Sequence, residues 1–264
     1  MFAAQRKAEI LDRLMAKGNV TVNQLAEDLG VSEPTIRRDL EDLEEEGKLK
    51  RTYGGAVTTE VSTFEPSLPE KVVHYPEEKS AIGRKALSLI ETGDTVLLDS
   101  GTTTLEIARN LPDMEITVVT NSLQIGQELS SCRKVKLLFL GGELRPTTGA
   151  FVGSLTESLL SQLNVDKLFL GTNAIDLERG VTTPNTTEAA TKRAMIYSAR
   201  EIILTADHSK FGKISLVKVC DFADLDVIVT DSDFPEEYAE VFEQNNVGMI
   251  LSSAEQYGKE IVND

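Results

Sequence analysis

The chain of 264 residues is long enough for two domains that each bury a core of their own. Its formal net charge of −16 lies mostly outside residues 1–57, which hold 9 Lys and Arg against 11 Asp and Glu, while the remainder holds 18 against 32. Two separated cysteines and two separated histidines argue against a disulfide framework or a metal cluster, and no leader or membrane-spanning apolar run is evident, so we expect a cytoplasmic protein with buried free thiols and no metal.

The first predicted elements are two helices joined by a tight turn. Residues 22–29 carry apolar side chains at helical spacing, and Gly30 ends this helix. Ser32 can cap a second helix with Pro34 in its first turn, where a missing N–H costs nothing. The inward stripe of the second helix consists of Ile36, Leu40 and Leu43. This order of elements is typical of a helix-turn-helix.

The second helix exposes Arg37 and Arg38 near its N-terminus, where a recognition helix contacts base edges and phosphates in the major groove. Residues 48–57 follow as a predicted wing, with three cations and two glycines suited to phosphate contacts. We therefore predict that residues 1–57 form a winged helix-turn-helix that binds double-stranded DNA. The predicted contact residues are Ser32, Glu33, Pro34, Thr35, Arg37, Arg38, Lys50, Arg51, Tyr53, Gly54 and Gly55. The alternative is a helical protein-interaction module whose arginines form a solvated face.

Residues 58–76 have the composition of a linker, with three prolines, scattered charges and no sustained periodicity. From residue 77 onward, helical patterns alternate with apolar, β-branched runs. Helices are predicted over 81–90, 104–110, 123–129, 156–163, 188–199 and 235–245, and strands over 95–98, 116–119, 135–140, 167–170, 201–204 and 226–229. This alternation predicts an α/β domain over residues 77–264 with a largely parallel sheet.

Small and hydroxyl-bearing residues follow four successive predicted strands, at 99–104, 120–122, 141–142 and 171–173. Ligands of open α/β sheets bind outside the carboxyl ends of the strands, where backbone N–H groups and a helix N-terminus can hold an anion. Any single loop of this kind could be an ordinary turn. Four in succession predict a polar small-molecule pocket at one edge of the sheet.

Five motifs lie along the chain: residues 31–40 (VSEPTIRRDL), 51–56 (RTYGGA), 99–104 (DSGTTT), 141–145 (GGELR) and 188–192 (EAATK). Together they resemble the DeoR/GlpR family of bacterial transcriptional regulators, and the resemblance covers nearly the whole chain. It implies an N-terminal domain that binds operators and a C-terminal domain, similar in fold to ribose-5-phosphate isomerase, that binds a phosphorylated sugar. It further implies a repressor of a sugar-utilisation operon that its effector releases from DNA. An activator of the same architecture is the alternative.

The residues at the predicted pocket suit a phosphosugar. Hydroxyl and backbone donors of residues 100–104 can bind a phosphate, Arg145, Lys192 and Lys210 can balance its charge, and carboxylates can accept hydrogen bonds from sugar hydroxyls. No P-loop or Gly-x-Gly-x-x-Gly pattern indicates a nucleotide, and no cofactor is expected. The predicted effector-binding residues are Asp99, Ser100, Gly101, Thr102, Thr103, Thr104, Asn121, Ser122, Gly141, Gly142, Arg145, Gly171, Glu188, Lys192 and Lys210, with Asp207 as a further acceptor. Surface solvation is the alternative for Lys192 and Lys210.

The resemblance to isomerases raises the question of catalysis. Residues 171–176 and 180–184 stand where such enzymes carry an acidic loop and a lysine-containing loop, and here the lysine loop and the first carboxylate are missing. Glu188 could match the isomerase base, but a general base without its partners has little to act with. We therefore predict a binding domain rather than an enzyme, with an isomerase bearing an accessory DNA-binding domain as the alternative. Paired half-sites on DNA imply a homo-dimer or homo-tetramer.

Overall fold

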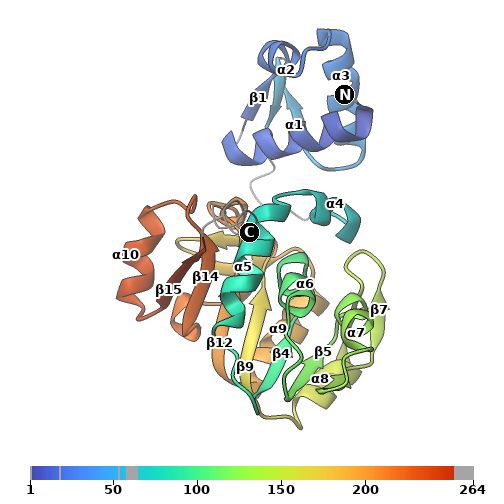
Figure 1. The fold of residues 1–264 in the computed structure, drawn as a ribbon. Coiled ribbons are helices and arrows are strands. Elements are labelled where there is room, and N and C mark those ends of the chain that lie inside the picture. The colour runs from blue at the N-terminus through green and yellow to red at the C-terminus, as the bar shows by residue number, and fades with distance from the viewer. Residues whose placement is uncertain (1, 18, 53, 58–64, 253–264) are drawn as a thin grey trace, which may run out of the picture. The chain divides into compact units, whose positions relative to one another are not determined.

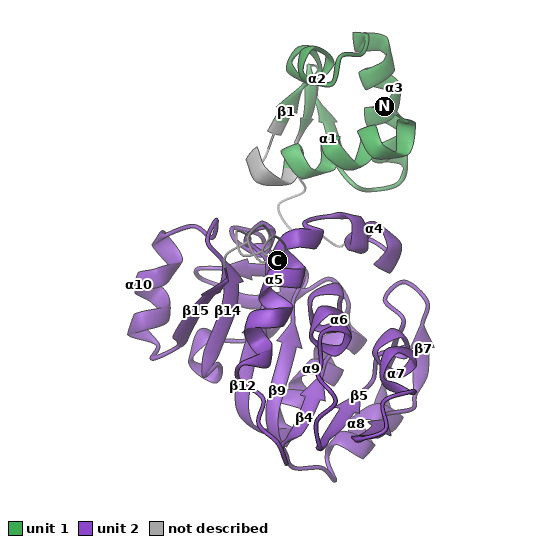
Figure 2. Cartoon of the chain, viewed as in Figure 1, with its two compact units in different colours: residues 1–64 green, residues 65–264 purple. Residues whose placement is uncertain are grey.

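The computed structural model describes residues 2–17, 19–52, 54–57 and 65–252 (Figure 1). The chain divides into two compact units, residues 1–64 and residues 65–264 (Figure 2). The division falls inside the predicted linker, and residues 65–76 belong to the second unit instead of standing between the two. Among the described residues, no helix is both long enough and apolar enough to cross a membrane.

The first unit is a helical core with a small antiparallel sheet. Its elements are α1 (Ala3–Lys17), β1 (Asn19–Thr21), α2 (Val22–Leu29), α3 (Glu33–Glu45), β2 (Lys50–Thr52) and β3 (Gly55–Val57). The strands pair in the order β1-β3-β2. This is the predicted winged helix-turn-helix: α2 and α3 flank the turn, and the hairpin of β2 and β3 is the wing. The preceding helix α1 and strand β1 were not predicted.

The predicted inward stripe forms the core of the first unit. Ile36, Leu40 and Leu43 of α3 are buried and pack with Ile10 and Leu14 of α1. A buried ion pair crosses the same interface, where Nη2 of Arg6 on α1 lies 3.1 Å from Oδ1 of Asp39 on α3. Asp39 therefore stabilises the packing of these two helices and is not part of an exposed acidic face.

Two glycines have specific roles in this unit. Gly30 has φ 64°, the left-handed conformation that ends α2, as predicted. Gly55 lies where β3 pairs with β1 so closely that an added Cβ would stand 1.8 Å from the carbonyl oxygen of Val20. Gly55 was predicted to permit close approach to DNA, but the close approach that the structure shows is between two strands of the protein.

The second unit is built around a seven-stranded parallel sheet with strand order β15-β14-β12-β9-β4-β5-β6. Its strands are β4 (Thr95–Leu98), β5 (Ile116–Thr120), β6 (Val135–Phe139), β9 (Val165–Gly171), β12 (Ala199–Thr205), β14 (Val227–Asp231) and β15 (Gly248–Ser252). The predicted parallel α/β domain is confirmed, and six of these strands were predicted to within a few residues.

Helices cover both faces of this sheet (Figure 1). The helices are α4 (Leu68–Val73), α5 (Pro76–Leu87), α6 (Thr102–Arg109), α7 (Leu123–Leu129), α8 (Ser154–Leu160), α9 (Thr186–Ser198) and α10 (Glu237–Gln244). Alternate residues along each strand enter two separate cores. Leu97 of β4 packs in the core that contains α8, α9 and α10, while its neighbours Val96 and Leu98 pack in the core that contains α5, α6 and α7.

The strand order reverses direction at the centre of the sheet. From β4 the chain proceeds outward through β5 to β6, and from β9 it proceeds the opposite way through β12 and β14 to β15. The point between β4 and β9 is therefore the topological switch point, where open α/β sheets leave a crevice outside the strand ends. This crevice, and not the whole sheet edge, is the place where a ligand site is expected.

Two small sheets and two short 3-10 helices complete the second unit. Their strands are β7 (Glu143–Arg145) with β8 (Ala150–Val152), and β10 (Ala174–Asp176) with β11 (Gly180–Thr183) and β13 (Val217–Cys220). The 3-10 helices are η1 (His208–Lys210) and η2 (Phe222–Asp224). None of these short elements was predicted. They matter because Arg145, Thr183 and Lys210 lie on three of them.

Candidate functional site

In the first unit, the N-terminal half of α3 presents the predicted reading surface. Arg37 and Arg38 are both exposed on this helix. The Arg37 side chain is 51% exposed, and its Nη2 lies 3.2 Å from Oε2 of Glu33, one turn earlier. Arg38 makes no ion pair with any other described residue. Ser32 has the backbone conformation of an N-cap, but its Oγ meets Oγ1 of Thr35 at 2.9 Å and caps no backbone N–H.

The wing contributes a second set of exposed residues. Lys50 and Arg51 on β2 and the turn residue Gly54 are exposed, while Tyr53 lies outside the described residues. Arg51 leans on α3: its Nη1 lies 3.4 Å from Oε1 of Glu41, and its backbone N donates to Oε1 of Glu44 at 2.8 Å. The acidic run of α3 therefore orients the wing, a role that the sequence pattern alone did not indicate.

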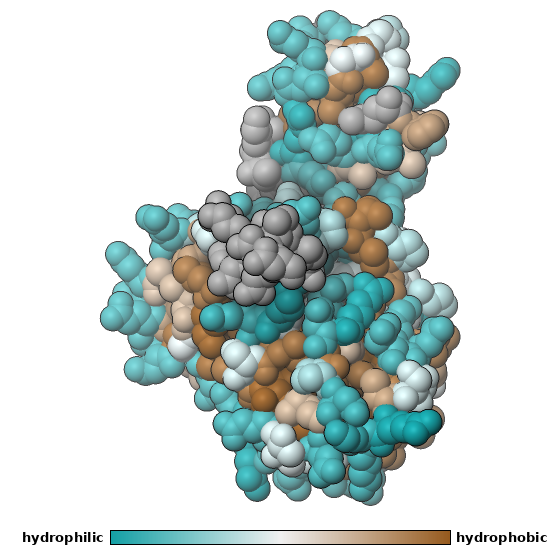
Figure 3. Space-filling view, viewed as in Figure 1, coloured by the Kyte–Doolittle hydropathy of each residue, from teal (hydrophilic) through white to brown (hydrophobic). Residues whose placement is uncertain are grey.

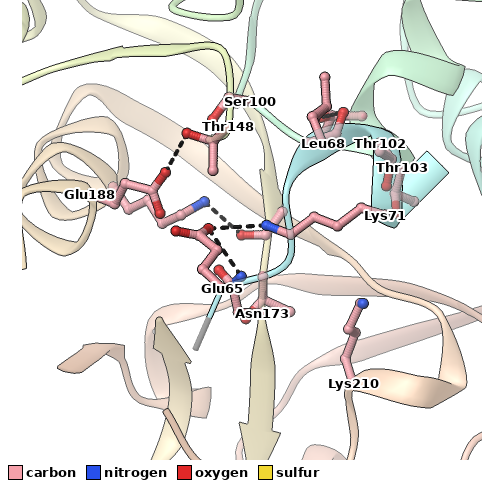
Figure 4. A pocket seen from close by; sticks show the side chains of 15 residues that line it. Glu65, Leu68, Lys71, Ser100, Thr102, Thr103, Thr148, Asn173, Glu188 and Lys210 are labelled. Atoms are coloured by element: carbon pink, nitrogen blue, oxygen red, sulfur yellow. Dashed lines mark hydrogen bonds and ion pairs between the residues drawn. The ribbon is translucent and has the colours of Figure 1, made fainter. Parts of the chain in front are cut away.

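The second unit holds a pocket at the switch point, between the ends of β4 and β9 (Figure 4), which we call the switch-point pocket. Its empty space of about 530 Å³ includes the open mouth. The lining residues are Glu65, Leu68, Lys71, Ser100, Gly101, Thr102, Thr103, Thr104, Thr148, Gly171, Thr172, Asn173, Glu188, Lys192 and Lys210. Nine of these fifteen were among the predicted effector-binding residues.

One wall of the switch-point pocket is the N-terminus of α6. The cap residue Gly101 has no side chain, and the first intrahelical bond runs from the N–H of Leu105 to the carbonyl oxygen of Gly101. The N–H groups of residues 102–104 thus have no intrahelical acceptor, and the positive end of the helix faces the pocket. The Thr104 hydroxyl donates to the carbonyl oxygen of Asp99 at 2.7 Å, so it positions the loop.

Two lysines come to the pocket from different elements. Lys71 lies on α4 and Lys210 on η1, and both line the pocket (Figure 4). Burial lowers the pKa of Lys71, although Glu65 opposes the shift, its carboxylate lying 3.0 Å from Lys71 Nζ. Lys210 Nζ lies 3.9 Å from Oδ2 of Asp207. Lys210 was predicted as a counter-charge, whereas Lys71 lies in the predicted linker and was missed.

The pocket floor contains a buried ion pair that joins the two central strands. Lys192 of α9 contacts the carboxylate of Asp99, which follows β4, and also donates to the carbonyl oxygen of Gly171 on β9 at 2.9 Å. Asp99 Oδ2 accepts the N–H of Gly171 at 3.0 Å. Lys192 is 5% exposed, so its surface-solvation alternative is wrong. Burial by itself would lower the pKa of Lys192. The carboxylates of Asp99 and Glu188 raise this pKa by more than burial lowers it, so the net shift is upward.

Glu188 is the centre of a second polar cluster. Its Oε1 lies 3.0 Å from Nη1 of Arg145 and accepts from Oγ1 of Thr148 at 2.8 Å, and its Oε2 accepts from Oγ1 of Thr183 at 3.4 Å. Burial by itself would lower the pKa of Arg145. Glu188 and Glu65 raise this pKa by more than burial lowers it, so the net shift is upward. The predicted residue Arg145 thus borders the pocket through Glu188 and Glu65.

Six predicted residues do not line the switch-point pocket. Asp99 and Arg145 form ion pairs with residues that do line it, and the other four make the contacts described next. Asn121 Nδ2 donates to the carbonyl oxygen of Phe151, and Ser122 caps α7. Gly141 accepts a hydrogen bond from Thr156 with its carbonyl oxygen, and an added Cβ at Gly142 would lie 2.1 Å from Oγ1 of Thr156. These residues follow β5 and β6, which lie beyond β4 from the switch point. Their strand ends share the edge of the sheet but not its crevice.

The arrangement does not resemble a proton-transfer site within the described residues. Glu188 is engaged by an arginine and two threonines, and Asp176 uses its Oδ1 to accept the N–H groups of Glu178 and Arg179 in the turn after β10. The carboxylate nearest in sequence to the expected acidic loop therefore closes a hairpin. The side chains that line the pocket include hydroxyls, an amide, lysines, Glu65 and Glu188, which are groups that can form hydrogen bonds with a ligand.

Comparison with known proteins agrees with this division of the chain. Residues 6–61 match the DeoR-like helix-turn-helix domain, and residues 74–232 match the DeoR C terminal sensor domain. The putative aga operon transcriptional repressor of Escherichia coli O157:H7 is 39% identical over 94% of this chain and 93% of its own length. The HTH-type transcriptional regulator GlpR of Haloferax volcanii is 39% identical over 95% and 98%. The transcriptional repressor AccR of Agrobacterium fabrum is 40% identical over 86% and 89%.

Solved structures give a weaker likeness. Ribose 5-phosphate isomerase A of Methanocaldococcus jannaschii is 16% identical, with a TM-score of 0.38 over 51% of this chain and 54% of that one. The translation initiation factor eIF-2B of Pyrococcus horikoshii is 15% identical, with a TM-score of 0.43 over 81% and 74%. The sequence matches carry the assignment, and they agree with the prediction that the chain is not an enzyme. The chain belongs to the DeoR family of DNA-binding transcriptional regulators, with an N-terminal helix-turn-helix domain and a C-terminal sensor domain.

Proposed function

We propose that the protein represses a sugar-utilisation operon and that a phosphorylated sugar, bound in the switch-point pocket, releases it from its operator. The observation that carries the proposal is the junction of an uncapped α6 N-terminus with Lys71 and Lys210 in one pocket. Free N–H groups and two ammonium groups together favour a dianion such as a phosphate monoester. The names of the relatives support repression.

The remaining lining residues suit the sugar part of such a ligand. Asn173 offers an amide, Thr148 and Thr172 offer hydroxyls, and Glu188 offers a carboxylate that is already oriented by hydrogen bonds. Groups of this kind donate to and accept from the vicinal hydroxyls of a sugar. The buried Lys192–Asp99 pair sits beneath them as fixed support. We assign the phosphate to the α6 end and the hydroxyls to the Glu188 end.

The DNA contacts are assigned to α3 and the wing. Arg38 lies on the exposed face of α3 and forms no ion pair with another residue that the structure describes, and Arg37 pairs with Glu33, an exposed partner one turn away. Either can pair with a guanine or clamp a phosphate. Lys50 and Gly54 add phosphate contacts from the wing. Two reading heads are required for an operator with paired half-sites, so the active species is at least a dimer.

Release follows from linkage between the two sites. If the phosphosugar binds the state with mispositioned heads more tightly than the DNA-competent state, operator affinity falls by the same ratio, typically about 5- to 150-fold. A thermal-shift screen with fructose 1-phosphate, tagatose 6-phosphate and glycerol 3-phosphate tests whether the protein binds a phosphosugar. A ligand at about 100 times its Kd adds roughly 2.7 kcal/mol to the free energy of unfolding.

Operator binding tests whether the phosphosugar releases the protein from DNA. A duplex selected from random DNA by the ligand-free protein is titrated with and without the best ligand, and we expect weaker binding with it. No stabilisation by any phosphosugar in the panel would refute the ligand class. Turnover of a phosphosugar by the purified protein would refute a purely sensory domain, and stronger DNA binding with ligand would refute release.

A further inference from the structure

The carboxylate of Glu65 occupies one side of the switch-point pocket. The Glu65 side chain is 4% exposed, and it is held by three groups. Its Oε1 lies 3.0 Å from Lys71 Nζ and 3.3 Å from Asn173 Nδ2 (Figure 4), and its Oε2 contacts Arg145. A protein anion therefore already sits among cations of a pocket suited to anions.

The charges around Glu65 hold it as a carboxylate. Burial by itself would raise the pKa of Glu65. Lys71 and Arg145 lower this pKa by more than burial raises it, so the net shift is downward. Lys71 is attracted by Glu65 on one side and repelled by the ammonium group of Lys210 on the other, and this repulsion lowers the pKa of Lys71. A dianion bound between Lys71 and Lys210 would relieve that repulsion, and it would repel the Glu65 carboxylate.

Polar contacts hold the segment that carries Glu65 on the rest of the second unit. Helix α4 buries none of its residues, and Val72 and Val73 are exposed, which Figure 3 shows as apolar surface over α4. Two of its attachments are the Leu68 N–H donating to the carbonyl oxygen of Thr147 at 2.9 Å and Lys79 Nζ donating to that of Lys71 at 2.5 Å. A capping box at Ser67 satisfies backbone N–H groups at the start of α4.

We infer that Glu65 is an internal anion that competes with the effector's phosphate for Lys71, so that effector binding displaces residues 65–73 from the pocket. The inference rests on the proposed function, because it needs an anionic ligand in this pocket. Residues 65–73 are the first part of the second unit, and residues 58–64 join them directly to the DNA-binding unit. Displacement of this segment converts occupancy of the pocket into a change at the covalent connection between the two units.

The first test replaces Glu65 and measures the binding of inorganic phosphate by isothermal titration calorimetry. Glu65→Gln keeps the size and hydrogen-bonding capacity of the side chain and removes the competing charge, so we expect phosphate to bind about 10-fold more tightly. Glu178→Gln is the matched control, since it removes the same charge from an exposed turn of the same unit. Equal affinity for phosphate in Glu65→Gln and wild type would overturn the inference.

The second test uses the wild-type chain, so it does not depend on the folding of a variant. Hydrogen exchange at the amides of Leu68 and Lys71, which donate to the carbonyl oxygens of Thr147 and Ser67, is measured with and without saturating phosphate. We expect at least about 10-fold faster exchange at Leu68 with phosphate bound. Unchanged or slower exchange would overturn the displacement while leaving a phosphate site intact. Failure of phosphate and of every phosphosugar to bind wild type would instead overturn the proposed function together with the inference.

Operator binding supplies a third readout, which does not depend on whether the effector weakens or strengthens DNA binding. Ligand-free Glu65→Gln is expected to shift operator affinity in the same direction as effector does for wild type, because both remove the hold of the carboxylate on Lys71 and Arg145. A shift in the opposite direction, or none, would contradict the link between Glu65 and the reading heads. Glu178→Gln should bind the operator as wild type does.

Discussion

Replacing Lys210 separates effector binding from DNA binding. Lys210 reaches the switch-point pocket from η1, and its ion pair with Asp207 is long, at 3.9 Å. Lys210→Met keeps the aliphatic stem and removes only the ammonium group. If that group contacts the phosphate, its loss costs about 1.5–3 kcal/mol of binding free energy, which corresponds to roughly 10- to 150-fold weaker effector binding.

The assay pairs two titrations of each variant, one of phosphosugar and one of operator DNA with and without phosphosugar. Lys210→Met should bind the operator like wild type and need roughly 10- to 150-fold more effector for release. Lys218→Met is the control, because Lys218 is an exposed lysine of the same unit outside the pocket. Thermal unfolding monitors the fold, since Asp207 is buried beside Lys210. A Lys210→Met protein that responds to effector like wild type would refute the placement of the phosphate.

Three further predictions concern the rest of the molecule. Arg38→Ala should weaken operator binding by about 1–3 kcal/mol if Arg38 contacts a base, with effector binding unchanged; equal affinity to wild type in a gel-shift titration would remove Arg38 from the interface. Gly55→Ala should destabilise the first unit by at least about 1 kcal/mol in chemical denaturation, because its Cβ would collide with the Val20 carbonyl, and an unchanged midpoint would show that the strands separate freely. Hydrogen bonding to Asp231 raises the pKa of His208 in the folded protein. The extra stability of wild type over His208→Gln should therefore be complete below a pH of about 6.5 and be lost as the pH rises through the folded pKa of His208. A stability difference that does not change with pH in urea titrations would refute this prediction.

The strands and helices that pack in the two main cores could be predicted from the sequence. Most of their apolar runs, such as the five residues of β5 and the seven of β12, are long enough to show β-branched composition, and they alternate along the chain with segments of helical spacing. The short strands β7, β8, β10, β11 and β13 have three or four residues each, which is too few for a periodic pattern. Strand β15 was missed because it stands at the sheet edge, where Met249 and Leu251 are exposed and no alternation of buried and polar residues appears.

The candidate site could be predicted only where it follows the strand-end rule. Residues 99–104 and 171–173 were found because their strands are flanked by small polar loops. The loops after β5 and β6 look the same in sequence, yet they lie away from the crevice, since strand order is a property of the whole sheet and not of any loop. Glu65 and Lys71 were missed because a Pro-flanked, charged segment has the local composition of a linker. Only packing on the sensor domain distinguishes it from one.

The two sides of the switch-point pocket differ in how they are built: one consists of the ends of the central strands, and the other is the segment of residues 65–73, which packs on the surface of the domain. Asp99 and Lys192 lock the ends of the two central strands, so a change at either would disturb the sheet itself. The opposite wall, residues 65–73, contributes nothing to the buried cores. Mutations there can reshape the ligand's surroundings at little cost in foldability. We therefore expect new effector preferences to arise first by substitution in this segment, with the strand-end floor unchanged, so that ligand choice and fold can evolve separately.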